Sequence, residues 1–195
     1  MSTVSHLIER SEWWDYIPGF FDGGLFEPLY TEMLQFCTTY KVKVYGNEFD
    51  SNRVSCYFTS TSALAALTRN YSNLPSFDWS VSALLSQIKG EIEKLIGTQY
   101  DYCLVHIYRD GEDSISWHND KEALHSDISS ISFGASRKFR FRKINETKGW
   151  ERELILNSGD VVHMKPGCQL RYKHCVPVEK RVKQPRINLT FRKLE

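Results

Sequence analysis

Apolar residues recur every three or four positions in two stretches of the first half of the chain, and this spacing predicts two helices. The first helix lies within residues 25–37. The second lies at about 79–96, with Asp78 or Ser80 as its expected cap and Gly97 at its end. The apolar stripes of the two helices are Phe26, Leu29, Met33, Phe36 and Cys37, then Val81, Leu84, Leu85, Ile88, Ile92 and Leu95.

The second half of the chain contains short runs in which apolar and polar residues alternate, as in strands with one buried face. Residues 41–61 are ambiguous, with strand-like pieces. Short strands at close spacing, preceded by two helices, predict an α+β fold of two sheets with the helices packed on one side. The runs lie at 103–108, 114–118, 127–133, 138–142, 154–157, 160–164 and 186–192.

The composition fits one domain without a membrane segment. The 195 residues are 41% hydrophobic and 25% charged, and we expect a single domain over 1–195 with a flexible N-terminus at 1–12. The sequence has no apolar run of transmembrane length and no apolar signal segment. Five cysteines without C-x-x-C spacing favour an intracellular, reducing compartment, the nucleus in a eukaryote and otherwise the cytoplasm. We expect a monomer.

The net charge of +1 excludes no class of partner, but the basic residues are unevenly distributed. Residues 137–143 read RKFRFRK and contain no acid. Such a run suits contacts with phosphates, and it equally fits a strand whose basic face is solvated. The charge pattern alone leaves both interpretations open.

The segment His118-Asn119-Asp120, followed later by His174, is the sharpest candidate for chemistry. Residues i and i+2 of an extended segment point to one side, so His118 and Asp120 can converge on one point. A histidine from a neighbouring strand completes two imidazoles and a carboxylate. Non-haem iron oxygenases use this ligand set and leave positions open for a co-substrate and dioxygen. The H-x-D tripeptide alone is weak evidence, because most such tripeptides are surface polar residues.

The last predicted strand, RINLTFR at 186–192, presents a polar face with two arginines. Alternation places Arg186, Asn188, Thr190 and Arg192 on this face, opposite three apolar residues. Arginine is the natural bidentate partner of a carboxylate, so a buried face of this kind suits a dicarboxylic acid held between a metal and an arginine. The alternative is an edge strand with a solvated basic face.

These motifs, in this order, resemble the AlkB family of oxidative nucleic-acid demethylases, most closely its DNA-repair branch. The similarity extends from about Trp14 to Arg192. The residues that carry it are Tyr108-Arg109-Asp110-Gly111 with Ile115, His118-Asn119-Asp120, Ile131-Ser132-Phe133-Gly134, Arg137, Phe139, Phe141, Arg142, Gly159-Asp160, Met164, Gln169, Tyr172, His174, Val176, Pro177 and the ending RINLTFR.

The resemblance implies a double-stranded β-helix (jelly-roll) core and a dioxygenase that depends on Fe(II) and 2-oxoglutarate. It implies that His118, Asp120 and His174 hold the iron. With dioxygen, such an enzyme hydroxylates an N-linked methyl group on DNA or RNA, of the 1-methyladenine or 3-methylcytosine type, and formaldehyde and succinate are released. The residues that the resemblance assigns to 2-oxoglutarate are Tyr108, Arg186, Asn188, Thr190 and Arg192.

The resemblance also implies a pocket for a base that is flipped out of the stack. Tyr45 lies where the DNA-repair branch has a wedge residue, and Tyr71 lies where it has an aromatic that stacks on the base. Arg53 matches a basic residue near this pocket, and Glu122 matches an acid that accepts a hydrogen bond from the base's exocyclic amine. The alternatives are a half-buried strand tyrosine at 45 and an ordinary loop glutamate at 122.

His106 departs from the family, which usually has asparagine two residues before the pocket tyrosine. On a strand, His106 and Tyr108 share a face, so the imidazole points at the co-substrate and can donate a hydrogen bond to it. Its size and its titration are expected to weaken co-substrate binding near neutral pH.

Two other functions fit parts of the sequence. A 2-oxoglutarate-dependent hydroxylase or demethylase of a protein side chain would need the iron ligands and both arginines, but no wedge and no basic surface. A catalytically silent nucleic-acid-binding module would have no reason to keep the ligands and the arginines together. The candidate pocket residues and the basic run therefore favour a nucleic-acid substrate.

Overall fold

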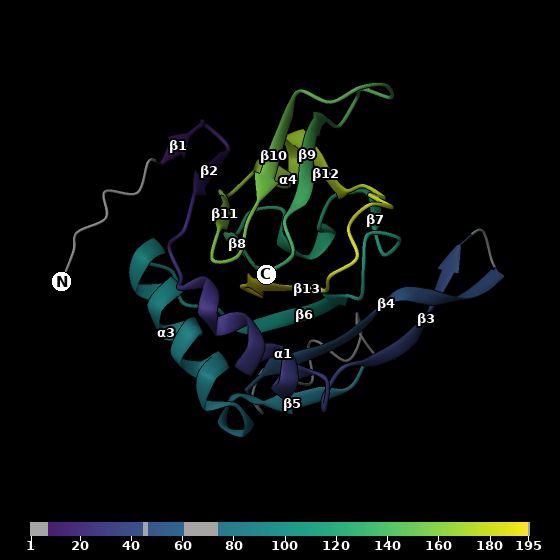
Figure 1. Ribbon diagram of the computed structural model, residues 1–195. Helices are drawn as coiled ribbons and strands as arrows, with labels where there is room; N and C mark the ends of the chain where they lie inside the picture. The colour runs from purple at the N-terminus through teal and green to yellow at the C-terminus, as the bar shows by residue number, and fades with distance from the viewer. Residues whose placement is uncertain (1–7, 45–46, 61–73, 195) are drawn as a thin grey trace.

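In the computed structural model, which describes residues 8–44, 47–60 and 74–194, two β-sheets face each other and helices cover the outer side of the larger one (Figure 1). The larger sheet has the strand order β1 (Glu9–Arg10), β2 (Trp14–Ile17), β11 (Val161–Met164), β8 (Ile128–Gly134), β13 (Arg186–Arg192), β6 (Tyr102–Tyr108), β4 (Asn47–Thr59) and β3 (Thr38–Val44). A short strand, β5 (Ser76–Asp78), pairs with β4 in parallel. The smaller sheet has the order β10 (Arg152–Leu156), β9 (Arg137–Lys143), β12 (Tyr172–Val176) and β7 (Ile115–His118).

The strands predicted in the second half are all present, with bounds that differ by at most two residues. The ambiguous segment 41–61 is largely a long antiparallel pair of strands, β3 and β4. The mostly β architecture with few helices is consistent with the expected jelly-roll fold. None of the helices in the described ranges is both long and apolar enough to span a membrane.

The helical stretches are shorter than predicted. Helix α1 covers Phe26–Met33 and α3 covers Ala83–Ile96, preceded by the 3-10 turns η1 (Gly23–Leu25) and η2 (Trp79–Val81). The side chain of Ser82 caps α3, whereas Asp78 caps η2, so the expected cap was wrong. Gly97 ends α3 in the left-handed conformation, as predicted. Residues of both helices belong to one buried cluster, although α3 follows β3, β4 and β5 in the chain.

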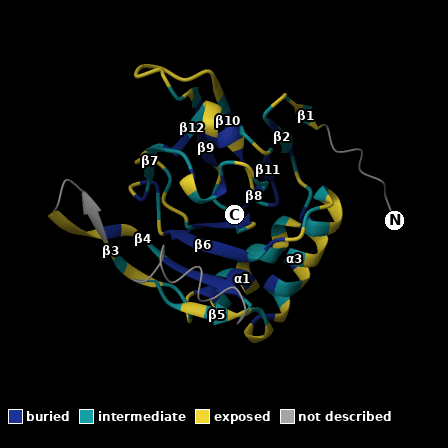
Figure 2. Ribbon diagram, turned by 180° about the vertical axis from the view of Figure 1, so that it is seen from behind, coloured by how far each residue is buried: buried dark blue, intermediate teal, exposed yellow. Residues whose placement is uncertain are grey.

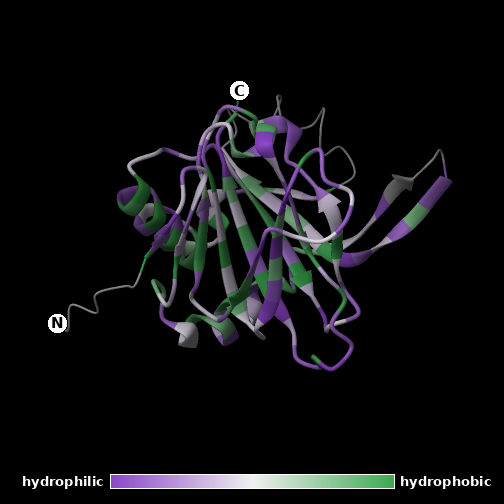
Figure 3. Cartoon of the chain, turned by 90° about the horizontal axis from the view of Figure 1, so that it is seen from above, coloured by the Kyte–Doolittle hydropathy of each residue, from purple (hydrophilic) through white to green (hydrophobic). Residues whose placement is uncertain are grey.

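The buried residues form two main layers (Figure 2). One layer lies between the larger sheet and the helices and contains Leu29, Met33, Leu85, Ile88 and Ile92 from α1 and α3. The other lies between the two sheets and contains Phe139 and Phe141 from β9. Apolar and polar residues alternate along the strands in Figure 3, and this alternation separates the two layers.

Strand β13 lies in the interior of the larger sheet, between β8 and β6, and every one of its residues is buried. Ile187, Leu189 and Phe191 pack into the layer under the helices. The other face, with Arg186 at 1% and Arg192 at 4% exposure, is therefore buried between the sheets. The alternative of a solvated edge strand was wrong.

Candidate active site

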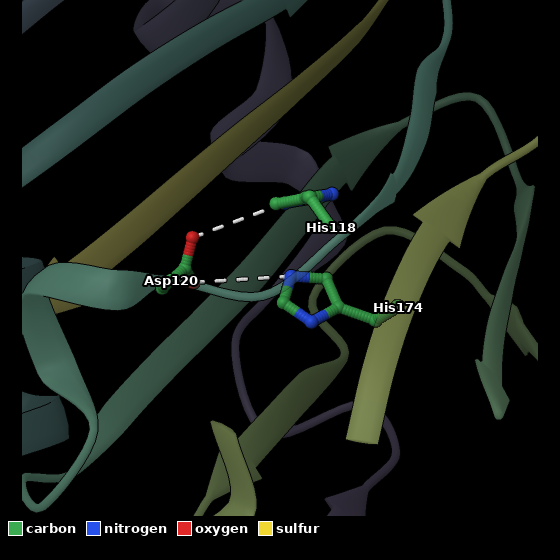
Figure 4. Close-up of side chains that lie close together, drawn as sticks. All are labelled: His118, Asp120 and His174. Carbon is green, nitrogen blue, oxygen red and sulfur yellow. Dashed lines mark ion pairs between the residues drawn. The ribbon is translucent and has the colours of Figure 1, made fainter. Parts of the chain in front are cut away.

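The two strands β7 and β12 bring His118, Asp120 and His174 together (Figure 4). His118 ends β7 and is directly opposite His174 on β12, while Asp120 follows β7 in the connection to the 3-10 turn η3 (Lys121–Ala123). Nε2 of each histidine lies 3.8 Å from a carboxylate oxygen of Asp120. One donor atom from each residue can be chosen so that all three lie within 4.8 Å of one another, as the H-x-D spacing predicted.

This donor set fits an iron ion. Two imidazoles and one carboxylate are the ligands of non-haem Fe(II) oxygenases. Nδ1 of His118 lies 2.8 Å from the carbonyl oxygen of Ser116, a contact that orients the ring and leaves Nε2 for the metal. Oδ2 of Asp120 is buried and has no hydrogen-bond donor among the described residues, which is costly unless a cation binds it.

Burial and the charges around the site favour a deprotonated carboxylate at Asp120 and a neutral imidazole at His174, the forms that bind metals. Burial alone would raise the pKa of the Asp120 carboxyl, but Arg192 and the two histidines hold this pKa well below its usual range. Burial, together with the neighbouring His118, lowers the pKa of His174 to about 3. Nη2 of Arg192 forms an ion pair of 2.8 Å with Oδ1 of Asp120.

Gln169 positions the metal-binding loop. It is one of the residues that carry the resemblance to the AlkB family, but the sequence did not indicate this role. It lies in the short helix α4 (Cys168–Arg171) and is 1% exposed. Its side-chain Oε1 accepts a hydrogen bond of 2.9 Å from the backbone N–H of Asp120, and its carbonyl oxygen accepts one of 3.0 Å from the Asn119 amide. Because both partners lie in the H-x-D segment, Gln169 fixes the carboxylate ligand relative to the histidines.

A cavity of about 200 Å³ adjoins the metal donors between the two sheets. The register of the larger sheet places rows of side chains across its inner face. Ser55 on β4 is opposite His106 on β6, which is opposite Asn188 on β13. In the next row, Tyr108 on β6 is opposite Arg186 on β13. The cavity is lined by His118, Asp120, His174, His106, Tyr108, Asn188, Thr190, Arg192, Arg53 and Glu122, together with apolar and other side chains.

The two arginines of β13 reach different parts of the site. Arg192 lies at the metal donors, whereas the guanidinium carbon of Arg186 lies 5.0 Å from the ring centroid of Tyr108. Arg186 donates a hydrogen bond of 2.8 Å to Ser132, but its buried Nε and Nη1 have no acceptor among the described residues. Buried guanidinium N–H groups are costly without an acceptor, so this end of the site fits a carboxylate.

Asn188 and Thr190 face the cavity but already bond to their neighbours. The Asn188 amide donates to Ser130 at 2.8 Å and to the carbonyl oxygen of Ile131 at 3.0 Å. Its oxygen accepts a hydrogen bond of 2.9 Å from the Thr190 hydroxyl. These bonds tie β13 to β8 on the cavity side, so both residues shape the wall that a co-substrate would contact.

His106 faces the cavity beside Tyr108, as the strand alternation predicted. It is 7% exposed, and its Nδ1 lies 2.6 Å from Oγ of Ser55. Burial, together with the nearby Arg53 and Arg192, lowers the pKa of His106 well below its usual value. The titration expected near neutral pH was wrong, because the imidazole is uncharged there.

Two of the four expected base-pocket residues lie in the described part of the chain, and both line the cavity. Arg53 is buried and donates hydrogen bonds to the carbonyl oxygen of Ser114 and to the Tyr40 hydroxyl. Glu122 lies 3.6 Å from Arg192, close to the metal donors. Tyr45 and Tyr71, the expected wedge and stacking residues, lie outside the described residues.

The basic run 137–143 is not a uniformly exposed surface. Arg137 is 1% exposed and donates hydrogen bonds to Glu179 and to three backbone carbonyl groups, so it holds the adjoining loops together. The prediction of a phosphate contact was therefore wrong for this residue. Arg140 pairs with Glu153 at 2.6 Å and Arg142 stacks on Trp117.

Comparison with known proteins agrees with this site. Residues 16–192 match the family model described as the 2OG-Fe(II) oxygenase superfamily. The chain is 32% identical to the mouse protein named DNA oxidative demethylase ALKBH2, over 79% of this chain and 66% of that protein. It is 38% identical to the bovine protein named alpha-ketoglutarate-dependent dioxygenase alkB homolog 3, over 56% of this chain and 42% of that protein.

The chain spans 53 to 66% of the length of the mouse, bovine and human proteins named ALKBH2. A solved structure described as "The structure of OsALKBH1" has the same fold, with a TM-score of 0.62 and 15% identity over 95% of this chain and 99% of that one. The motifs, the geometry of the metal donors and the family model agree. The chain therefore belongs to the 2OG-Fe(II) oxygenase superfamily and, within it, to the AlkB family.

Proposed function

We propose that this chain is an Fe(II)- and 2-oxoglutarate-dependent dioxygenase that removes N-linked methyl groups from DNA, with RNA as a second candidate substrate. The substrates are bases of the 1-methyladenine and 3-methylcytosine type, and the products are the unmethylated base, formaldehyde, succinate and carbon dioxide. One observation carries the proposal: a single cavity between the sheets is lined by the three metal donors, by Tyr108 and by Glu122. The names of the relatives, which refer to DNA oxidative demethylation, support the choice of substrate.

Bound iron and 2-oxoglutarate would supply, with dioxygen, the oxidising power for hydroxylating a methyl group. His118, Asp120 and His174 would hold the iron. Arg186 and Tyr108 would orient the far carboxylate of 2-oxoglutarate. Arg192 keeps Asp120 ionised and fixed in place.

The remaining walls of the cavity serve the substrate. The Glu122 carboxylate can accept a hydrogen bond from an exocyclic amine of a base, and Arg53 lies on the same cavity. Leu104, Phe139, Met164 and Val176 give the cavity apolar walls that exclude water around the reacting methyl group.

Residues from both sheets line one cavity, which supports our proposal that residues 1–195 act as one unit. We also propose that the protein is a monomer. The cysteines among the described residues are all free, which supports a reducing intracellular location, the nucleus in a eukaryote.

The test is formaldehyde release from oligonucleotides that carry 1-methyladenine or 3-methylcytosine, with Fe(II) and 2-oxoglutarate. We expect release by the wild-type protein and a loss of at least 100-fold, on the order of the cost of losing a metal ligand, in Asp120→Ala. The matched control is Asp50→Ala, because Asp50 is an exposed aspartate paired with Lys41. Unmethylated oligonucleotides should release nothing. Turnover with a methylated protein side chain but with no oligonucleotide would reject the proposed substrate.

A further inference from the structure

Ser55 and His106 form a buried polar pair on the cavity side of the larger sheet. They are directly opposite each other on β4 and β6, and Oγ of Ser55 lies 2.6 Å from Nδ1 of His106. Ser55 is 0% exposed and His106 is 7% exposed. The imidazole lines the cavity that adjoins the metal donors.

We propose that Ser55 is a positioning residue that holds His106 in the tautomer with its proton on Nε2, so that Nε2 donates a hydrogen bond to a carboxylate oxygen of 2-oxoglutarate. The inference rests on the proposed function, since 2-oxoglutarate is the ligand. It assigns a role to Ser55, which matched no motif in the sequence.

The tautomer follows from hydrogen-bond complementarity. An uncharged imidazole has one N–H donor and one acceptor nitrogen. Because Nδ1 faces Ser55, Nε2 is the nitrogen left for a ligand in the cavity. A carboxylate only accepts hydrogen bonds, so Nε2 must carry the proton and Nδ1 must accept from the Ser55 hydroxyl.

The surroundings of the imidazole favour an anionic ligand. Arg53 on β4 and Arg192 on β13 are close enough to lower the pKa of His106, as is His118 on β7, while Asp120 acts in the opposite direction. A neutral N–H donor between such cations can bind a carboxylate without a buried positive charge on the imidazole itself.

Asn188, the neighbour of His106 on the other side, cannot set the tautomer. It is opposite His106 in the register of β6 and β13, but its amide donates to Ser130 and Ile131 and its oxygen accepts from Thr190. Ser55 is thus the group in contact with Nδ1 that can select between the two tautomers.

The family's usual asparagine suggests a direct experiment. An asparagine side chain has a fixed amide donor and no tautomers, so it does not need Ser55. We therefore expect the effect of Ser55→Ala to depend on the residue at position 106. A double-mutant cycle of Ser55→Ala with His106→Asn isolates this coupling.

The binding measurement is the 2-oxoglutarate dissociation constant of the Fe(II)-loaded protein without dioxygen. We expect Ser55→Ala to weaken binding about tenfold, the cost of about one hydrogen bond to a charged group. Ser55→Thr, which keeps the hydroxyl, should bind nearly as the wild type does. In the His106→Asn background, Ser55→Ala should change the dissociation constant less than twofold.

The matched control is Ser129→Ala. Ser129 is a buried serine whose Oγ lies 3.3 Å from Nδ1 of His163, so the variant loses a serine–histidine contact that does not line the cavity. Its 2-oxoglutarate affinity should match that of the wild type.

A second readout needs no variant of Ser55. Nitrogen-15 NMR of histidine-labelled protein should show His106 protonated at Nε2 in the 2-oxoglutarate complex, with His106→Asn providing the assignment. Protonation at Nδ1, or an equal loss from Ser55→Ala in both backgrounds, would overturn the inference while leaving the proposed function intact. A wild-type protein that binds no 2-oxoglutarate would overturn both.

Discussion

His106 is enclosed by protein on every side except the cavity, and a proton on its imidazole would lie near the guanidinium groups of Arg53 and Arg192. Burial disfavours the charged form, and the two cations disfavour it further. The imidazole therefore stays neutral at the pH of the cell. The same residue on a surface would titrate near neutral pH, so its environment decides its chemistry.

This neutrality predicts a pH dependence of stability. Below pH 6.5 the unfolded chain takes up a proton that the folded His106 does not, so the free energy of unfolding falls as the pH decreases. His174 also makes the free energy of unfolding fall as the pH decreases, because burial lowers its pKa to about 3 in the folded protein. Between pH 6 and pH 5, the free energy of unfolding of the metal-free wild type should fall by about 1 kcal/mol per pH unit more than that of His106→Asn.

Urea denaturation at pH 5 to 8 measures this difference. His125→Asn provides the control, because His125 is exposed and does not line the active-site cavity. Equal slopes for the wild type and His106→Asn below pH 6 would contradict a buried, neutral imidazole at position 106.

At the scale of the element, the connection between β6 and β7 places the metal ligands relative to the co-substrate residues. It runs from Arg109 to Ser114, and Gly111 holds it against the loop that follows β12. The N–H of Gly111 donates to Val182 and its carbonyl oxygen accepts from Glu179. A Cβ atom at Gly111 would overlap the carbonyl oxygen of Glu179.

Gly111→Ala should therefore push the two loops apart. We expect a loss of about 1 to 3 kcal/mol in the free energy of unfolding, measured by urea denaturation. The control is Gly90→Ala on α3, where a Cβ atom would have no other atom within 4 Å. That substitution should be neutral or stabilise by up to about 1 kcal/mol. Similar stability of the two variants would show that the loops are not locked together.

The elements show what local sequence can and cannot predict. The face of β13 that carries Arg186 and Arg192 was predictable, because strand alternation depends only on neighbouring residues. The partner of His106 was not, since Ser55 reaches it through the pairing of β4 with β6, which are far apart in the sequence. Arg137 shares a face with Phe139 and Phe141, so strand alternation alone places it on the buried side. Its ion pair with Glu179, which lies in a distant loop, was not predictable from the local sequence.

At the scale of the whole molecule, the site exists only where the two sheets meet. The smaller sheet contributes His118 and His174, and the loop after its strand β7 contributes Asp120. The larger sheet contributes His106 and Arg192. Gln169, on a short helix between β11 and β12, fixes the metal-binding loop. Correct docking of the sheets therefore assembles the metal donors and the co-substrate residues in one step.

The central claim is that this one site couples 2-oxoglutarate turnover to removal of a methyl group from a base. The most direct measurement is the ratio of succinate to formaldehyde formed in the same reaction with an oligonucleotide that carries 1-methyladenine or 3-methylcytosine. We predict equal amounts of the two products, and loss of both in Asp120→Ala. Succinate formation that no methylated oligonucleotide stimulates, without formaldehyde, would contradict the claim.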